Sequence, residues 1–297
     1  MRRRISLAIS LSLAIAAALV SVDAARATEA VAKSILVTVL DDAGGPIRDL
    51  RASEFIVTED GTQREVIEVR PNNEALYVAL LVDTAKPAPG VQFPTQDMRR
   101  GLAAFCRRVL SGTAGSEVAI MDLAQGGSVV VPSTSEFRKI KPWTDRLVES
   151  QQGAGVLLEA LVAASRELMN RESPRRAIVS VTFDGPESSA ITPQSVADTV
   201  LKSGAAYWPV TIRGIAGIRP ALVPLRDTLF SNLPEPTGGM QVTAVSTTAM
   251  ESILNRVAAA LTSQYEVTYA RPTGITPRVI QASARRGAKV LRASWIR

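Results

Sequence analysis

The sequence contains no histidine, and this absence excludes several classes of function. Without an imidazole the chain cannot build a Ser-His-Asp or Cys-His nucleophile, a histidine-ligated zinc site or an imidazole acid–base catalyst. It also lacks a G-x-S-x-G motif, a Ser-x-x-Lys pair and a phosphate-binding glycine loop. We therefore expect a protein that is not an enzyme.

Cysteine is almost absent as well. The single cysteine, Cys106, excludes an intrachain disulfide. It lies in a helical pattern of apolar residues, so we expect a small buried hydrophobic side chain rather than a reactive thiol.

Long apolar runs are confined to the N-terminus. Three arginines at positions 2–4 precede an apolar run over residues 5–22, and small-residue cleavage sites follow at residues 22–24 and 25–27. This pattern predicts an export signal over residues 1–27. A membrane anchor is the alternative, because the run has nearly spanning length. No later segment is long and apolar enough to cross a bilayer, so we expect an exported mature chain, periplasmic or secreted, with no transmembrane segment.

Positive charge is unevenly distributed. The full chain carries a formal charge of +6, and removal of residues 1–27 takes away four of 34 basic and one of 28 acidic residues, which leaves +3. Residues 271–297 contain basic but no acidic side chains, and the central members of this basic patch are Arg285, Arg286, Lys289 and Arg292. Such a patch could contact anionic lipid or polymer of a cell envelope. A solvated face of a β-hairpin is the alternative, and nucleic acid is not an expected partner of an exported protein.

The middle of the chain predicts a mostly parallel sheet. Apolar strand-like runs alternate with amphipathic helical patterns from residue 76 to about 262, which favours a doubly wound α/β fold with helices on both faces. The predicted strands are 76–83, 117–123, 127–131, 177–183, 207–213 and 240–244. The predicted helices are 94–110, 136–149, 156–170, 193–203, 222–232 and 247–262.

Short alternating runs at both ends of the chain predict a second, smaller β-structure. Three lie near the N-terminus (34–40, 54–60 and 64–70), and three lie near the C-terminus (265–272, 277–284 and 288–295). Neither set can bury much core alone, so we expect them to form one small β-sandwich into which the α/β domain is inserted. The expected division is a signal peptide over 1–27, an N-terminal β-module over 28–75, the α/β domain over 76–263, and completing strands over 264–297.

Several motifs in this order resemble a von Willebrand factor A-type (VWA) domain, and more specifically the VWA-related secreted proteins known from acidobacteria. They are VTVLDDAGGPIRDLRASEFIVTEDGTQREVIEV, LYVALLVDT, AIVSVTFDGPES, PTGGMQVTAV and SQYEVTYARP, followed by a basic C-terminal segment. The resemblance covers nearly the whole mature chain. It implies the VWA fold and a role in binding another protein.

The resemblance also implies a metal-ion-dependent adhesion site, in which side-chain oxygens hold Mg²⁺. In the family these oxygens come from D-x-S-x-S after the first strand, a threonine in a later loop and the aspartate of a T-D-G stretch. The matching positions here are Asp83, Ala85, Pro87, Gly155 or Val156, and Asp184. Only the two aspartates carry a side-chain oxygen. The site is therefore expected to be degenerate, with no functional metal, or with weak binding of Mg²⁺ or another divalent cation through Asp83 and Asp184 as the alternative.

Two further hypotheses concern these residues. Lys86 could place its ammonium group where the metal would have been, or it could simply point into solvent. Asp83 and Asp184 could instead be turn residues that bond to their own backbone. The sequence thus predicts an exported, non-enzymatic adhesion or scaffold module that binds an unidentified protein without a metal, with a structural envelope protein that uses the basic patch as the alternative.

Overall fold

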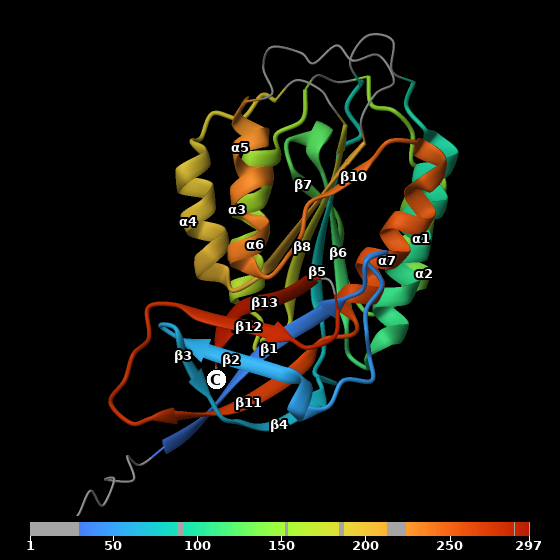
Figure 1. The fold of residues 1–297 in the computed structure, drawn as a ribbon. Coiled ribbons are helices and arrows are strands. Elements are labelled where there is room, and N and C mark those ends of the chain that lie inside the picture. The colour runs from blue at the N-terminus through green and yellow to red at the C-terminus, as the bar shows by residue number, and fades with distance from the viewer. Residues whose placement is uncertain are drawn as a thin grey trace, which may run out of the picture.

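A six-stranded sheet lies at the centre of the computed structural model, which describes residues 30–87, 92–151, 154–183, 187–212, 224–287 and 289–296 (Figure 1). The strand order is β10-β9-β8-β5-β6-β7, and all neighbours are parallel except β6 and β7. The strands are β5 (Tyr77–Val82), β6 (Glu117–Asp122), β7 (Ser128–Thr134), β8 (Arg176–Phe183), β9 (Ala206–Ile212) and β10 (Val242–Ala244). The predicted doubly wound α/β fold is confirmed.

Helices cover both faces of this sheet (Figure 1). On one face lie α1 (Thr95–Gly112), α2 (Phe137–Arg146) and α7 (Met250–Leu261). On the other lie α3 (Leu157–Met169), α4 (Pro193–Ser203), α5 (Pro224–Asn232) and the short α6 (Pro234–Thr237). The unbroken apolar sequence of β5 follows from this cover, because Leu80 packs into the core under α1 while Leu81 packs into the core under α3.

Two antiparallel sheets from both ends of the described chain form the β-module. The four-stranded sheet has the order β13-β1-β11-β4, and the three-stranded sheet has the order β12-β2-β3. The strands are β1 (Ala30–Leu40), β2 (Phe55–Glu59), β3 (Thr62–Arg64), β4 (Val66–Pro71), β11 (Tyr265–Pro272), β12 (Ile280–Ala284) and β13 (Lys289–Ile296). A separate apolar core, which includes Ile35, Val57 and Val267, lies between the sheets. The expected sandwich of N- and C-terminal strands is therefore present.

The β-hairpin assumed in the alternative interpretation of the basic patch is not formed by the described strands. The last two strands, β12 and β13, do not pair with each other as a hairpin, because β12 pairs with β2 and β13 pairs with β1. The reason is that each of the two strands completes a different sheet of the module. Val37 and Val39 of β1 face the inter-sheet core, and β13 continues that sheet by placing Val290 opposite Val39.

Arg175 holds the β-module against the α/β part. Its side chain is only 1% exposed, and its guanidinium donates to the carbonyls of Asn72, Glu74 and Leu261 at 3.1, 2.6 and 2.9 Å and to Oε1 of Gln264 at 3.2 Å. Burial lowers its pKa to about 10. These acceptors lie where the chain leaves the β-module after β4 and where it returns before β11, so a single side chain ties both connections.

The Thr-Gly-Gly stretch at the end of α6, residues 237–239, has a packing explanation. Thr237 Oγ1 accepts a hydrogen bond from the backbone N–H of Tyr207 at 3.0 Å, and Gly238 has the left-handed φ of 81° that ends the helix. A Cβ on Gly239 would lie 1.9 Å from the carbonyl oxygen of Tyr207. Glycine is thus required for the close approach of this segment to β9.

Candidate functional site

The carboxyl-terminal ends of neighbouring parallel strands bring three loops together at one edge of the sheet, the usual ligand-binding edge of such folds. Asp83 follows β5 directly and is 4% exposed, and its N–H donates to the carbonyl of Val181 in β8 at 2.9 Å. Gly155 and Glu187, from the loops before α3 and after β8, form an isolated parallel bridge beside it. We call Asp83, Gly155, Glu187 and Arg226 the strand-end cluster.

Arg226 of α5 supplies the positive charge of this cluster. Its side chain is 2% exposed, and Nη1 and Nη2 lie 3.4 and 3.5 Å from Oδ2 of Asp83. Nη1 also donates to the carbonyl of Phe183 at 3.2 Å, and Nε donates to Oε2 of Glu187. One guanidinium therefore bridges two buried carboxylates and the end of β8.

Glu187 joins the cluster to the N-terminus of α3. Its Oε1 accepts hydrogen bonds from the N–H of Leu157 at 2.9 Å and from the hydroxyl of Ser189. Two carboxylates against one guanidinium leave one formal negative charge, and the positive end of the α3 dipole lies against it. The charges of the cluster are thus partly offset within the fold.

The electrostatics of Asp83 reflect two opposing effects. Burial raises the pKa of Asp83, and the Arg226 guanidinium together with the N–H of Ala85, 3.1 Å from Oδ1, opposes that rise. Ionised Asp83 therefore depends on Arg226, because an unpaired buried carboxylate is strongly disfavoured.

The donor set that the described residues place around Asp83 does not fit a divalent cation. Ala85 and Pro87 are buried and offer no side-chain oxygen, which leaves Mg²⁺ without the ligands it requires. Of the two positions that could match the family's threonine, Gly155 is the one beside Asp83. A Cβ at Gly155 would lie 3.1 Å from Oδ1 of Asp83 and 3.2 Å from Nη2 of Arg226. Among the described residues, no group of three or more histidine, cysteine, aspartate or glutamate side chains gathers where it could hold a metal.

The other predicted site residues lie apart from the strand-end cluster or outside the residues that the structure describes. Lys86 is exposed and makes no ion pair with Asp83, so the cation beside that carboxylate comes from α5 and not from the loop. Val156 is half-buried at the start of α3. Asp184 lies outside the described residues. Sequence reasoning missed both Arg226 and Glu187, and the only signals were a lone arginine between apolar residues of a predicted helix and a glutamate shortly after Asp184.

A second carboxylate at the same edge, Asp122, is held by its own loop and by Thr84 of the loop after β5. Asp122 accepts from Thr84 Oγ1 at 2.7 Å, from the N–H of Ala124 at 3.1 Å and from Nε2 of Gln125 at 3.1 Å. Burial raises the pKa of Asp122, and these hydrogen bonds oppose the rise. Asp122 therefore closes the turn after β6.

The predicted basic patch is partly neutralised. Arg286 contacts Asp49 and Glu54 at 3.1 and 3.0 Å, and Arg285 donates to the carbonyl of Ser53 at 3.2 Å. Lys289 is exposed and Arg292 is half-buried. The four residues thus do not form one uniform cationic surface.

No protein-family model and no curated protein matches this sequence. Similar solved structures include BatB from Bacteroides thetaiotaomicron, with 18% identity over 63% of this chain and 98% of that chain and a TM-score of 0.46. They also include a von Willebrand factor type A protein from Catenulispora acidiphila, with 11% identity over 90% of this chain and 75% of that chain and a TM-score of 0.49. The VWA domain of SpRpn10 has 14% identity over 62% of this chain and 95% of that chain, with a TM-score of 0.43. These similarities concern the fold and transfer no function to this chain.

Within the described part of the chain, no helix has the length and apolar character needed to span a bilayer.

Proposed function

We propose that this chain is an exported, non-enzymatic module that binds another protein without a bridging metal ion. The observation that carries the proposal is the buried contact of Arg226 with Asp83 and Glu187. A permanent guanidinium beside these carboxylates provides the positive charge that a divalent cation would otherwise supply at this edge of a VWA-like sheet. The charge is thus part of the fold and needs no metal from solution.

The strand-end face around this cluster is the proposed contact surface. Exposed polar side chains, among them Lys86 and Gln125, surround the buried cluster on the loops after β5 and β6. A surface of this kind recognises a partner by shape and by hydrogen bonds at its rim, while the cluster keeps the loops in one conformation. Export is proposed from the basic and apolar segment over residues 1–27.

The test is affinity capture from envelope extract with the mature chain, residues 28–297, as bait, with and without EDTA. We expect the same partner to be retained in both conditions. Lys86→Glu should weaken retention, whereas Lys202→Glu, an exposed charge reversal on α4, should leave it unchanged. Loss of the partner on chelation, or equal retention by the Lys86→Glu variant, would contradict the metal-free contact at this face.

A further inference from the structure

A groove opens along one side of the six-stranded sheet, between the edge strand β7 and helix α2. It has a volume of about 540 Å³. One wall consists of the consecutive residues 130–134 of β7, and the other consists of Lys139, Pro142, Trp143 and Arg146 of α2. The last three of these helical residues come three, four and seven positions after the first, so all lie on one face of the helix.

The floor of the groove is apolar. Val130 and Trp143 pack against the core under α1 but are only partly buried, so each also lines the groove. Pro132 and Pro142 line the same space. The indole N–H of Trp143 has no hydrogen-bond partner among the described residues. Tryptophan in a pocket is enriched among the residues that dominate binding energy at protein interfaces.

The strand edge itself does not favour an added strand. Among the described strands, β7 pairs only with β6, so its other edge is open. Pro132 within β7 has no N–H to donate, and proline is one of the residues that protect edge strands from pairing. A partner is therefore expected to bind mainly through its side chains.

The charged residues in the described lining of the groove are both basic. Lys139 is 59% exposed and shares Glu136 with Arg138, at 2.6 and 2.5 Å. One carboxylate between two cations leaves an excess of positive charge at this end of α2. Arg146, in the last turn of α2, is exposed and has no ion-pair partner among the described residues. Both ends of the helical wall are thus positively charged.

Positive charge also surrounds the groove. Helix α1 contains four arginines and one aspartate, and α2 with the glutamate before it contains four basic and two acidic residues. These two segments have an excess of five positive charges, more than the three of the whole mature chain. Arg99 donates to the carbonyl of Leu147 at 2.9 Å, and the guanidinium of Arg107 lies 4.9 Å from the centre of the Phe137 ring, so both arginines lie beside α2. A surface of this sign attracts an acidic partner.

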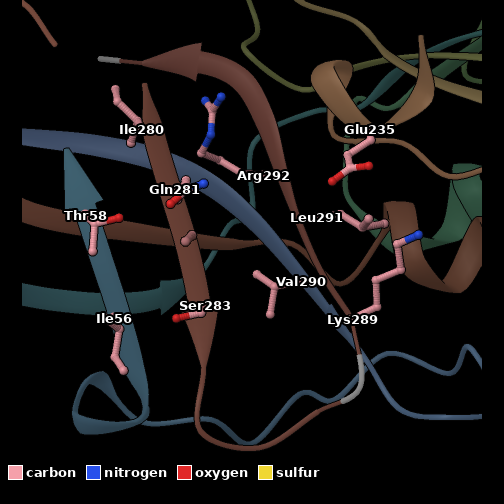
Figure 2. A pocket seen from close by; sticks show the side chains of 11 residues that line it. Ile56, Thr58, Glu235, Ile280, Gln281, Ser283, Lys289, Val290, Leu291 and Arg292 are labelled. Carbon is pink, nitrogen blue, oxygen red and sulfur yellow. The ribbon is translucent and has the colours of Figure 1, made fainter. Parts of the chain in front are cut away.

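Another groove, between β12 and β13, lacks this uniform sign (Figure 2). Its volume is about 450 Å³, and its lining contains the acidic Glu235 as well as the basic Lys289. Figure 2 shows these two residues on the same side of that groove. Opposite charges in one lining do not select a partner of one sign, so the groove between β7 and α2 is the stronger candidate.

The distance between the two basic residues of the lining defines the partner further. Lys139 and Arg146 are seven residues apart, which corresponds to roughly 10 Å along the helix at about 1.5 Å per residue. An extended segment covers this distance in about three residues, at about 3.3 Å per residue. Trp143 lies between the two positions on the same face of α2. A matching segment thus has two acidic residues three or four positions apart, with a large apolar residue between them.

We propose that the groove between β7 and α2 binds an extended acidic segment of another protein, which inserts a large apolar side chain beside Trp143. The acidic residues of the segment lie against Lys139 and Arg146. The concave shape favours a protein segment over an anionic membrane, because a flat bilayer surface would leave the apolar floor unfilled. This site is separate from the strand-end face and does not depend on the function proposed for that face.

The test uses a random dodecapeptide library displayed on phage, selected against the mature chain. We expect enrichment of peptides in which two acidic residues, three or four positions apart, flank a leucine, phenylalanine or tryptophan. Affinities of labelled synthetic copies are then measured by fluorescence anisotropy. Arg146→Glu should weaken binding about tenfold, with a smaller effect at high salt. Lys202→Glu, the matched reversal of an exposed basic residue in the last turn of α4, should leave binding unchanged.

Trp143→Ala should weaken binding about thirtyfold, because it removes the side chain beside which the apolar anchor inserts. The urea unfolding midpoint of each variant separates loss of binding from loss of fold. If Trp143→Ala does not fold, Arg146→Glu still decides the question, since Arg146 is exposed.

The proposal is overturned if no peptide is enriched, or if the enriched peptides lack acidic residues or a large apolar residue. It is also overturned if these peptides bind the folded Arg146→Glu variant as tightly as the parent. Two other occupants would overturn it as well. One is lipid, if the parent but not Arg146→Glu sediments with phosphatidylglycerol vesicles and the selected peptides do not compete. The other is a second copy of the chain, if light scattering shows a dimer that Arg146→Glu abolishes.

Discussion

Replacement of Arg226 by methionine tests the strand-end cluster most directly. The substitution keeps an unbranched side chain of similar length but removes the guanidinium, so Asp83 and Glu187 lose their shared cation and the carbonyl of Phe183 loses its donor. The side chains of Arg226, Asp83 and Glu187 are 2%, 5% and 1% exposed. Removal of one partner from a buried ion pair of this kind costs about 3–5 kcal/mol of unfolding free energy.

The assay is urea unfolding at pH 7, followed by tryptophan fluorescence, because Trp208 is buried in β9. Arg100→Met is the matched control, since Arg100 also pairs with an aspartate, Asp97 at 2.6 Å, but is 64% exposed. This exposed pair should contribute less than about 1 kcal/mol. If Arg226→Met costs no more than Arg100→Met, the reasoning about the buried cation is refuted.

The pH dependence of the same variant gives a second measurement. Burial already raises the pKa of Asp83, and loss of Arg226 removes a group that opposes the rise. The folded variant then binds more protons than the unfolded chain between the ordinary value of 3.8 and the raised pKa, so its unfolding free energy falls as the pH rises through that window. The cost of Arg226→Met should therefore be smaller at pH 4.5 than at pH 7. An equal cost at both pH values would contradict the role assigned to Asp83.

Three further predictions concern other positions. Gly155→Ala should destabilise the chain by about 1–3 kcal/mol, because the new Cβ lies against the buried cluster, and it should cost less in an Arg226→Ala background, as a double-mutant cycle in urea will measure. Gly239→Ala should cost more than about 3 kcal/mol or prevent folding, because the methyl group would overlap the carbonyl of Tyr207. Burial raises the pKa of Cys106 to about 12 from 9.0, so the unfolded thiol ionises first. Between pH 9 and 10, below the range in which the buried tyrosines contribute, stability should fall by up to roughly 1.4 kcal/mol per pH unit, and Cys106→Ala should lack this slope.

Each of these predictions has a clear control or contrary outcome. Gly44→Ala is the control for Gly239→Ala, since Gly44 has a φ of 77° but nothing within 4 Å of its added Cβ, and it should cost only about 1 kcal/mol. Equal costs of Gly155→Ala with and without Arg226 would show that the two positions do not interact. Rapid reaction of Cys106 with a thiol reagent in the folded protein would contradict its burial.

The sequence predicted those features that depend on local patterns. The apolar run over residues 76–83 indicated a buried strand with Asp83 at its end, and β5 with Asp83 directly after it is what the structure contains. The six predicted helices all lie close to observed ones, because each has its own amphipathic repeat. Among the described α-helices, α6, a four-residue helix, is the one that the sequence did not predict, because one turn is too short to show a period.

The strand-end cluster could not be predicted, because its members are far apart in the sequence. Arg226 lies in a helix whose pattern is satisfied equally well by an exposed arginine, and only the packing of α5 over the edge of the sheet turns that side chain inward. Lys86, by contrast, is close to Asp83 in sequence but exposed in space. The partners of β12 and β13 could not be predicted for a similar reason. Their alternation of apolar and polar residues is compatible with several neighbouring strands, and the choice depends on which core each strand completes.

The pairing of β1 with β11 has a consequence for biosynthesis. Ser34 and Thr268, whose hydroxyl groups bond at 2.9 Å, are separated by 234 positions in the chain. At a synthesis rate of about 5–20 residues per second, roughly 12 to 47 s pass between the appearance of β1 and that of its partner. During this interval the most apolar strand of the β-module has no native neighbour on that side, while the α/β part can already fold. The four-stranded sheet of the β-module can therefore be completed only after the inserted α/β part has been synthesised, so the delay depends on the length of that part rather than on the size of the β-module.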